Sequence, residues 1–290
     1  MTTRKCEKVL VLGASGMLGN TLLRFLATSP GIDVVGSIRG ARIPEGLADE
    51  FHHLLRTGID VTEESRLSSL LDAERPDTLV NCVGLVKQRH EAQSPELAIR
   101  INALIPHVLA RLCSKAGTRL IHISTDCVFD GASGNYREDS AANCADLYGR
   151  SKLLGEVTEG GALTLRTSII GAELGNGFGL LSWFLRQDGS TRGFTRAIFS
   201  GMTTLELSRV IRDYILTDRT LQGLYHVSAD PISKYDLLHL IGEVYGKQLR
   251  LDKDDGLIID RSLDSTAFRN RTNYRPPDWP SLIRNMKAFG

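Results

Sequence analysis

Lys8-Val-Leu-Val-Leu-Gly13-Ala-Ser-Gly16-Met-Leu-Gly19 is the stretch that decides the fold of this chain. A short apolar run leads into three glycines spaced three residues apart, and an amphipathic segment over 20–28 follows. A strand, a glycine turn and a helix start in this order predict a dinucleotide site. Gly13 allows the tight turn, Gly16 lets backbone N–H groups approach a pyrophosphate at the helix N-terminus, and Gly19 lets helix and strand pack closely. The residues expected to line the cofactor here are Gly13, Ser15, Gly16, Met17, Leu18 and Gly19.

Strand and helix signals alternate through the first 170 residues. Strands are expected over 33–38, in a segment ending at 59–61, and over 77–84, 120–124 and 163–170. One helix is expected to be capped around Thr62, and a second runs from the N-cap Ser94 to the stop signal Gly117. The apolar stripe of this second helix is Leu97, Ile101, Leu104, Val108 and Leu112. Such alternation predicts an α/β fold, a Rossmann-type doubly wound parallel sheet with helices on both faces.

Beyond residue 170 the alternation breaks, and 171–201 is rich in glycine and reads as irregular. Further helices are expected over 203–216 and from Ser233, with a strand over 224–227 between them. We therefore expect an NAD(P)-binding Rossmann domain over 1–170, to which roughly 195–230 returns. Residues 171–290 are expected to form a smaller C-terminal substrate-binding lobe. This lobe should close over the carboxyl edge of the sheet, where ligands bind in such folds.

Composition narrows the classes of function. The net charge of +1 gives no electrostatic case for a nucleic-acid or anionic-membrane partner. The five cysteines are odd in number and lack paired spacing, so we expect reduced thiols and neither disulfides nor a metal site. The first strand begins too early for a signal peptide, and no apolar run approaches membrane-spanning length. The expectation is a soluble, cytoplasmic protein.

Tyr148-Gly-Arg-Ser-Lys152 places a phenol and an ammonium four residues apart, after the strand that ends near Thr125. Residues at this spacing are neighbours on one helix face. Because a nearby ammonium favours phenolate, we expect Lys152 to lower the pKa of Tyr148. A tyrosine tuned in this way can give or take a proton near neutral pH.

Four motifs make the chain resemble the extended short-chain dehydrogenase/reductases, and within them the dTDP-4-dehydrorhamnose reductase-like family. They are the glycine turn, Asn81-Cys-Val-Gly84, Ser124-Thr-Asp-Cys-Val-Phe-Asp-Gly131 and Tyr148-Gly-Arg-Ser-Lys152. The resemblance implies an NAD(P)H-dependent reductase of a nucleotide-linked 4-keto-6-deoxy sugar, in surface polysaccharide precursor synthesis. A nucleotide sugar would be the substrate, and a homodimer is compatible with the resemblance.

The resemblance also implies roles for single residues. Tyr148 would protonate the substrate carbonyl, Lys152 would hold the nicotinamide ribose, Thr125 would polarise the carbonyl, and Asn102 would join a water relay. Asp60 would accept from the adenine amino group. The other implied cofactor contacts are Val61, Cys82, Val83 and Gly84, and the implied substrate contacts are Lys87, Gln88, Ser124, Asp126 and Arg261.

The residues at the end of the second strand predict which cofactor is preferred. A carboxylate there usually binds the adenosine ribose 2′-hydroxyl, and this strand ends Ser37-Ile38-Arg39 without one. The planar guanidinium of Arg39 suits a 2′-phosphate. We expect NADPH to be preferred, with NADH as the alternative.

The loop after the fourth strand departs from the family pattern, because Gln88-Arg89 stands where Val-Asp is usual. Amide and guanidinium donors suit a carbonyl, which favours a UDP-2-acetamido-4-keto-6-deoxyhexose over the dTDP sugar. Two other functions stay open. Nucleotide-sugar epimerases and dehydratases use the same Tyr and Lys, and dehydratases place an acid beside the catalytic Thr, as Asp126 is placed here. A relative of this group is a non-catalytic, dinucleotide-binding regulatory subunit of methionine adenosyltransferase. The acids of a magnesium-bridged dimer cannot be placed, so no metal is expected.

Overall fold

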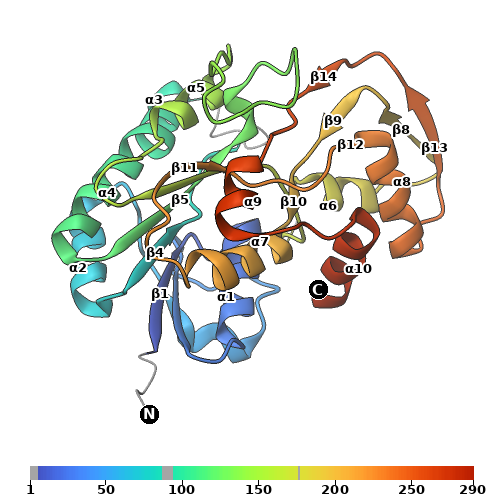
Figure 1. The fold of residues 1–290 in the computed structure, drawn as a ribbon. Helices are drawn as coiled ribbons and strands as arrows, with labels where there is room; N and C mark the ends of the chain where they lie inside the picture. The colour runs from blue at the N-terminus through green and yellow to red at the C-terminus, as the bar shows by residue number, and fades with distance from the viewer. Residues whose placement is uncertain (1–5, 87–93, 176) are drawn as a thin grey trace.

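A seven-stranded parallel sheet forms the centre of the computed structural model, which describes residues 6–86, 94–175 and 177–290. Its strand order is β11-β6-β5-β4-β1-β2-β3, so the chain winds outward in both directions from β1 (Figure 1). This confirms the predicted doubly wound α/β fold. The strands are β1 (Glu7–Leu12), β2 (Ile32–Ser37), β3 (Leu55–Arg56), β4 (Thr78–Asn81), β5 (Arg119–Thr125), β6 (Leu163–Thr167) and β11 (Gly223–His226).

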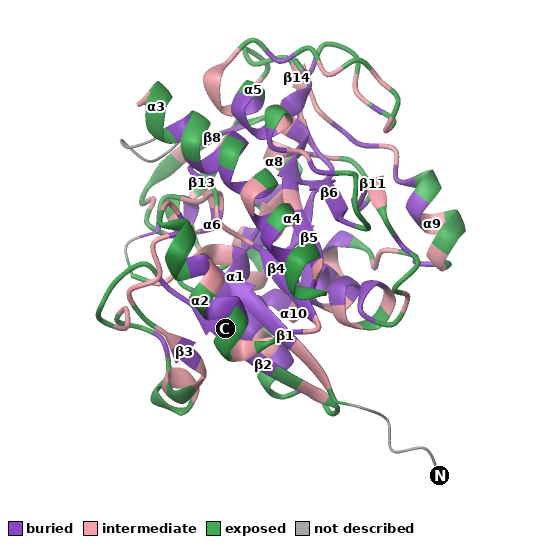
Figure 2. Ribbon diagram, turned by 90° about the vertical axis from the view of Figure 1, so that its left-hand side faces the viewer, coloured by how far each residue is buried: buried purple, intermediate pink, exposed green. Residues whose placement is uncertain are grey.

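The alternating side chains of β1 explain why both faces of the sheet are covered. Val9 and Val11 belong to a core shared with α1 (Met17–Ala27) and α7 (Thr204–Val210). Leu10 and Leu12 belong to a second core, shared with α2 (Glu64–Glu74) and α4 (Ile105–Ala116). Successive strand residues point to opposite faces, so an uninterrupted apolar run is what a sheet between two helical layers requires. Figure 2 shows the central strands buried and the outer helix faces exposed.

The helix that precedes β5 begins as predicted but does not keep the predicted apolar face. Ser94 caps α3 (Pro95–Ala98) by accepting from Leu97 N at 3.4 Å, and Gly117 ends α4 with φ 69°. Between α3 and α4 the chain forms a π-helix, Ile99–Leu104. The wider turns of this segment shift the face that meets the sheet. Leu97 and Leu104 are therefore 38% and 54% exposed, contrary to the prediction.

Together α3, the π-helix and α4 form one continuous helix, Pro95–Ala116, which tests the expectation that no apolar stretch reaches membrane-spanning length. Its 22 residues are long and apolar enough to cross a membrane by length and composition alone, so that expectation was too strong. Half of its most apolar window is buried inside the molecule, and its α4 part packs in the second core. The core helix of a globular domain passes the same test, so this helix is weak evidence for a span.

Three further details differ from the prediction. The third strand ends at Arg56, and 59–61 lies in the connection that follows, although Ile59 N still donates to Ile38 O at 2.9 Å. The cap of α2 is Glu63, because Thr62 is engaged by the carboxylate of Asp60. The strand expected over 163–170 breaks at Ser168, beyond which β7 (Ile169–Ile170) pairs with β10 (Met202–Thr203).

The segment 171–201 is not irregular throughout, as it begins a second lobe at the right of Figure 1. Parallel strands β8 (Ser190–Phe194) and β13 (Arg250–Asp254) form one ribbon. A second sheet places β9 (Ala197–Phe199) between β12 (Ile232–Ser233) and β14 (Ile259–Asp260). The helices of this lobe are α6 (Leu180–Leu185), α8 (Lys234–Tyr245) and α10 (Trp279–Phe289), while α9 (Thr266–Thr272) packs on β11 of the central sheet. Phe184, Leu237 and Ile283 belong to the same core as α1, so the lobe is packed against the sheet.

Candidate active site

The turn between β1 and α1 has the geometry of a phosphate site. Gly13 has a φ of 87°, in the left-handed region that favours glycine, and its N–H donates to Ser37 O at 3.1 Å. A Cβ on Gly19 would lie 2.2 Å from Gly13 O, so no side chain fits there. Helix α1 begins at Met17 after the N-cap Gly16, which has no side chain to cap it. Its first N–H groups can therefore bind an anion, and the residues fit the pyrophosphate of a dinucleotide.

Arg39 and Asp60 lie near each other beyond the ends of β2 and β3. Asp60 accepts from Thr62 N and Thr62 Oγ1, both at 2.8 Å. The backbone bond from Thr62 is the largest cause that lowers the pKa of Asp60, and the Arg39 charge contributes. Arg39 itself is exposed. A carboxylate and a guanidinium are thus available to the adenosine half of a dinucleotide that starts at Gly13.

Tyr148 reaches Thr125 because α5 (Leu147–Leu154) packs tightly on the segment after β5. Asp146 caps α5 by accepting from Gly149 N at 3.0 Å. A Cβ on Gly149 would lie 2.2 Å from Cys127 O, so this glycine permits the close approach. The hydroxyl groups of Tyr148 and Thr125 are hydrogen-bonded. A phenol and a strand-end hydroxyl therefore meet at one point, as the predicted roles require.

The expected effect of Lys152 on Tyr148 is corrected by the structure. Burial is the largest cause and raises the pKa of Tyr148; Cys127, Asp126 and Asp146 raise it further, and the hydrogen bond with Thr125 opposes the shift. Lys152 is instead turned toward β5, where its Nζ donates to Ile123 O at 2.7 Å. Burial lowers the pKa of Lys152 to about 8, against the opposing charges of Glu156 and Cys82. Helical spacing places the two residues on one face but does not decide which groups they contact.

Asn102 lies in the π-helical segment and joins two parts of the site. Its Oδ1 accepts from Leu85 N at 2.8 Å, and its Nδ2 donates to Leu85 O at 3.1 Å and to Ser151 Oγ at 3.2 Å. A Cβ on Gly84 would lie 3.5 Å from Asn102 Oδ1 and 3.9 Å from Lys152 Nζ. The Asn102 amide thus holds the chain after β4 against α5. Its part in a water relay stays a prediction.

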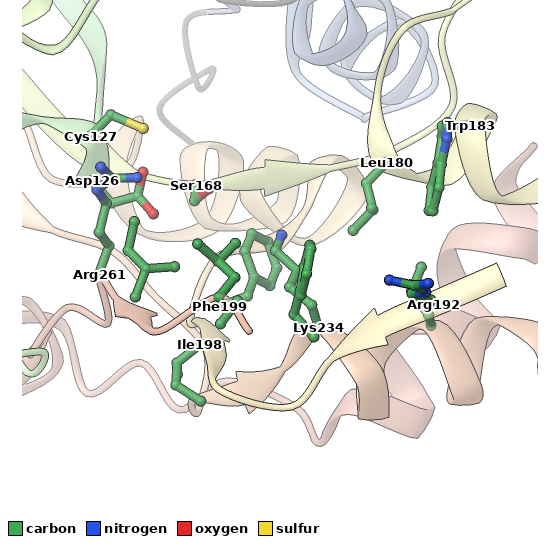
Figure 3. Close-up of a pocket in the computed structure, with 15 residues that line it drawn as sticks. Asp126, Cys127, Ser168, Leu180, Trp183, Arg192, Ile198, Phe199, Lys234 and Arg261 are labelled. Carbon is green, nitrogen blue, oxygen red and sulfur yellow. The ribbon is translucent and has the colours of Figure 1, made fainter. Parts of the chain in front are cut away.

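A pocket of about 490 Å³ opens beside Asp126, between the sheet and the second lobe (Figure 3). Asp126 and Arg261 lie at one end, Trp183 and Arg192 at the other, and Lys234 projects into the middle. The apolar part of the lining comes from Leu180, Trp183, Phe194, Phe199, Leu238 and Leu257. Three cations and one acid on apolar walls suit an anionic ligand that also has an apolar part.

The charges of this pocket are only partly solvated. Burial raises the pKa of Asp126, while its hydrogen bonds and the Arg261 and Lys234 charges oppose the shift. Burial lowers the pKa of Lys234. The Lys234 Nζ lies 4.2 Å from the centre of the Phe199 ring, a cation–π contact that aims the ammonium.

Of the predicted substrate residues, the structure places some at the pocket and others away from it. Asp126 and Arg261 line the pocket, and Arg261 Nε donates to Phe129 O at 2.8 Å. Ser124 turns away from it, since its hydroxyl donates to Glu156 Oε1 at 2.7 Å. Lys87 and Gln88 lie outside the described residues, as does Arg89.

Sequence reasoning missed Lys234, Arg192 and Trp183 of the pocket. For Lys234 a signal existed, because Ser233 marks a helix start, and Ser233 does cap α8. Among the described residues, no group of three or more His, Cys, Asp or Glu side chains is placed to hold a metal ion. None of the five cysteines, all of which the structure describes, forms a disulfide.

Comparisons with known proteins agree with this geometry. The family model described as the RmlD substrate binding domain matches residues 7–251. The chain is 24% identical to a dTDP-4-dehydrorhamnose reductase of Aggregatibacter actinomycetemcomitans, over 97% of this chain and 99% of that protein. It is 32% identical to a probable low-salt glycan biosynthesis reductase of Haloferax volcanii, over 90% of this chain and 87% of that one.

Two further proteins bear on the fold and on the open alternatives. The crystal structure of a dTDP-4-dehydrorhamnose reductase of Bacillus anthracis in complex with NADP matches with a TM-score of 0.79, at 22% identity, over 97% of this chain and 99% of that one. A methionine adenosyltransferase 2 subunit beta of Danio rerio is 28% identical, over 82% of this chain and 74% of that one.

Proposed function

This chain belongs to the RmlD substrate-binding-domain family of extended short-chain dehydrogenase/reductases, and from that premise we propose that it is an NADPH-dependent reductase of a nucleotide-linked 4-keto-6-deoxy sugar. One observation carries the proposal to this chain's own residues. The hydrogen-bonded pair of Thr125 and Tyr148 adjoins Asp126, at the end of the cationic pocket. This adjacency supports Tyr148 as the proton donor to a sugar carbonyl held in the pocket, and the phosphate turn at the carboxyl end of β1 supports a dinucleotide beside it.

The mechanism assigns separate tasks to the two hydroxyl groups. NADPH, when bound, supplies the hydride. Tyr148 donates its proton to the carbonyl oxygen as negative charge develops there, and its raised pKa keeps the phenol protonated until that moment. The Thr125 hydroxyl, which donates to Asp126 Oδ1 at 3.2 Å in this structure, would turn its proton to the same oxygen once the carbonyl is bound. Lys152, buried behind them, is assigned to the nicotinamide ribose.

We expect Lys234→Met to raise the KM for the nucleotide sugar about tenfold or more, because charge-assisted hydrogen bonds contribute about 1.5–3 kcal/mol. The ammonium projects into the pocket and is assigned to a phosphate or carbonyl oxygen of the sugar nucleotide. The KM for NADPH should not change. Steady-state kinetics with each substrate varied in turn measures both, and an equal rise in the two KM values would contradict the assignment.

Arg39→Ala is expected to lower the ratio of kcat/KM for NADPH to that for NADH by about tenfold, since it removes the guanidinium assigned to the 2′-phosphate. Asp60 stays in place in this variant and its contacts with Thr62 do not involve Arg39. Arg284→Ala, on exposed α10 surface, is the matched control. An unchanged cofactor ratio in Arg39→Ala would remove Arg39 from the cofactor site.

The proposed function is tested with a panel of UDP- and dTDP-linked 4-keto-6-deoxy sugars, with and without a 2-acetamido group. NADPH oxidation is followed by absorbance, and each product is identified by NMR. We propose the UDP-2-acetamido sugar as the preferred member, because of Gln88-Arg89. A higher kcat/KM on the dTDP sugar would reverse that preference while leaving the reductase class in place.

Two observations support alternative functions, a dehydratase and a regulatory subunit, which the same experiments can detect. Asp126 is buried beside Thr125 with a raised pKa, as an acid for dehydration would be. Release of water from the parent UDP- or dTDP-hexose, which still has its 6-hydroxyl and is added to the panel, without net NADPH oxidation would favour a dehydratase. The similarity to a methionine adenosyltransferase subunit supports a regulatory role. Absence of turnover on every sugar, with stoichiometric association to that transferase, would favour it.

We also propose a compartment for the enzyme. Five cysteines without a disulfide, of which Cys113 and Cys144 are buried, fit a reducing compartment, so we assign the protein to the cytoplasm. A homodimer remains a prediction, to be measured by the mass of the protein in solution.

A further inference from the structure

His122 is a buried titratable residue that the proposed mechanism does not use. It lies in the middle of β5 with no exposed surface, and burial together with the Lys152 charge holds its pKa well below its ordinary value. It is therefore a neutral imidazole at physiological pH. One ring nitrogen, Nδ1, lies 3.1 Å from Asn81 Nδ2, and the other, Nε2, lies 3.5 Å from Lys152 Nζ.

The position of the ring proton follows from the hydrogen bonds of Asn81. Val83 N donates to Asn81 Oδ1 at 3.1 Å, which fixes the side-chain oxygen on that side. The amide nitrogen Nδ2 then faces His122, and it can only donate. Nδ1 of His122 must accept this bond, so a neutral ring carries its proton on Nε2. That N–H is directed at Lys152.

Facing a donor, Lys152 is better placed as an amine than as an ammonium. An amine can donate one hydrogen to Ile123 O, 2.7 Å away, and accept from His122 Nε2 with its lone pair. An ammonium has no lone pair and would place two donors against each other. The contact is long, so its effect is electrostatic more than that of a strong hydrogen bond.

We propose that Asn81 and His122 are positioning residues that hold an N–H donor against the amino group of Lys152 and so favour its amine over its ammonium form. The other titratable groups that act on Lys152 are Cys82, after β4, and Glu156, after α5, and both favour the ammonium. Behind His122, the exposed His107 of α4 adds a smaller effect on the ring. Burial raises the pKa of the Cys82 thiol to about 12, so Glu156 is the anion that the Asn81–His122 pair opposes near neutral pH. The pair itself is built entirely from buried residues.

The pH dependence of activity that follows from this inference rests on the proposed function, whereas the protonation of His122 and Lys152 does not. If the ammonium of Lys152 holds the cofactor ribose and favours the developing phenolate, activity must fall as pH rises through the pKa of Lys152. The pH at which kcat/KM falls on the alkaline side should then depend on the Asn81–His122 pair, because the pair acts on the pKa of Lys152. The tautomer of His122 does not depend on any reaction, so it can be tested even if the assigned substrate is wrong.

The first experiment determines the His122 tautomer in the wild-type protein by long-range ¹H–¹⁵N NMR of labelled histidine. We expect a protonated Nε2 and an unprotonated Nδ1 for the resonance that is lost in His122→Gln. A protonated Nδ1 would overturn the proposal outright, because Nε2 would then be an acceptor for the Lys152 ammonium.

The second experiment compares pH profiles. In His122→Gln the side-chain amide can turn its oxygen to Lys152, which favours the ammonium, so the alkaline limb should move up by about one pH unit. His239→Gln, on an exposed face of α8, is the matched control and should leave the limb in place. An unchanged limb in His122→Gln, or an equal shift in the control, would contradict the proposal.

Discussion

Tyr148→Phe is expected to lower kcat by about 10²–10⁴-fold while leaving NADPH binding intact, because it removes only the hydroxyl that donates the proton. The ring stays in its half-buried site, and the helix that carries it is capped by Asp146 independently of the phenol. The measurement is kcat on the preferred nucleotide sugar, with the dissociation constant of NADPH from fluorescence titration.

Tyr245→Phe is the matched control for this loss. Tyr245 lies at the end of α8, and burial raises its pKa as well, so the control removes a partly buried phenol of the same kind. Its kcat should stay within about twofold of wild type, in keeping with the small effects of most changes outside a site. If Tyr148→Phe turned over at the wild-type rate, the assignment of Tyr148 as the proton donor would be wrong.

The pH dependence of the same reaction distinguishes a raised pKa of Tyr148, as in this structure, from the lowered pKa that the Tyr148–Lys152 spacing alone predicts. A tyrosine with a lowered pKa would lose its proton, and the enzyme its activity, as pH approached neutrality from below. Here burial raises the pKa of Tyr148, so the phenol stays protonated across the physiological range. The base that titrates near pH 8 is Lys152. Activity should therefore be limited on the alkaline side by Lys152.

The parts of the site that sequence predicted are those formed by local chain geometry. Gly13, Gly16 and Gly19 belong to one turn, and their need for glycine follows from φ and from the close approach of Gly19 to Gly13 O. Tyr148 and Lys152 share one helix. Strand alternation predicted the sheet, because buried parallel strands and their helices have distinct apolar patterns.

The parts that sequence missed depend on contacts between distant segments. Lys234 and Arg192 reach the Asp126 pocket only because the second lobe folds over the sheet edge, and no periodicity in 171–201 indicates that path. The π-helix at 99–104 changes which residues of a regular stripe are buried, so Leu104 is exposed. The direction of the Lys152 amino group is set by Ile123 O and His122 on another element. Spacing along one helix cannot supply that information.

Removing the charge of Glu156 is expected to have the largest effect on stability. Glu156 and Arg166 form a bidentate ion pair with contacts of 2.8 and 2.7 Å, and their side chains are only 8% and 6% exposed. Arg166 also lies over the Phe129 ring and bonds His226, whose pKa burial lowers to about 4, so that imidazole is neutral and supplies no charge. Glu156 is thus the only acid that pairs with this guanidinium within the described residues.

Glu156→Gln keeps the shape of the side chain but leaves the Arg166 charge buried without a counter-ion. Losing one partner of a buried ion pair costs about 3–5 kcal/mol, so we expect the free energy of unfolding to fall by that amount in urea titration. Glu64→Gln breaks the exposed pair with Arg111 and should cost less than about 1 kcal/mol.

The double variant Glu156→Leu with Arg166→Met separates a lost charge partner from a damaged core. It removes both charges and fills the site with apolar groups, so it should recover most of the stability lost in Glu156→Gln. Ser124 loses its acceptor in the double variant, which leaves a residual cost of about 1 kcal/mol. If Glu156→Gln cost no more than Glu64→Gln, the Arg166 guanidinium would have to be solvated in the folded protein, and its burial in this structure would be wrong.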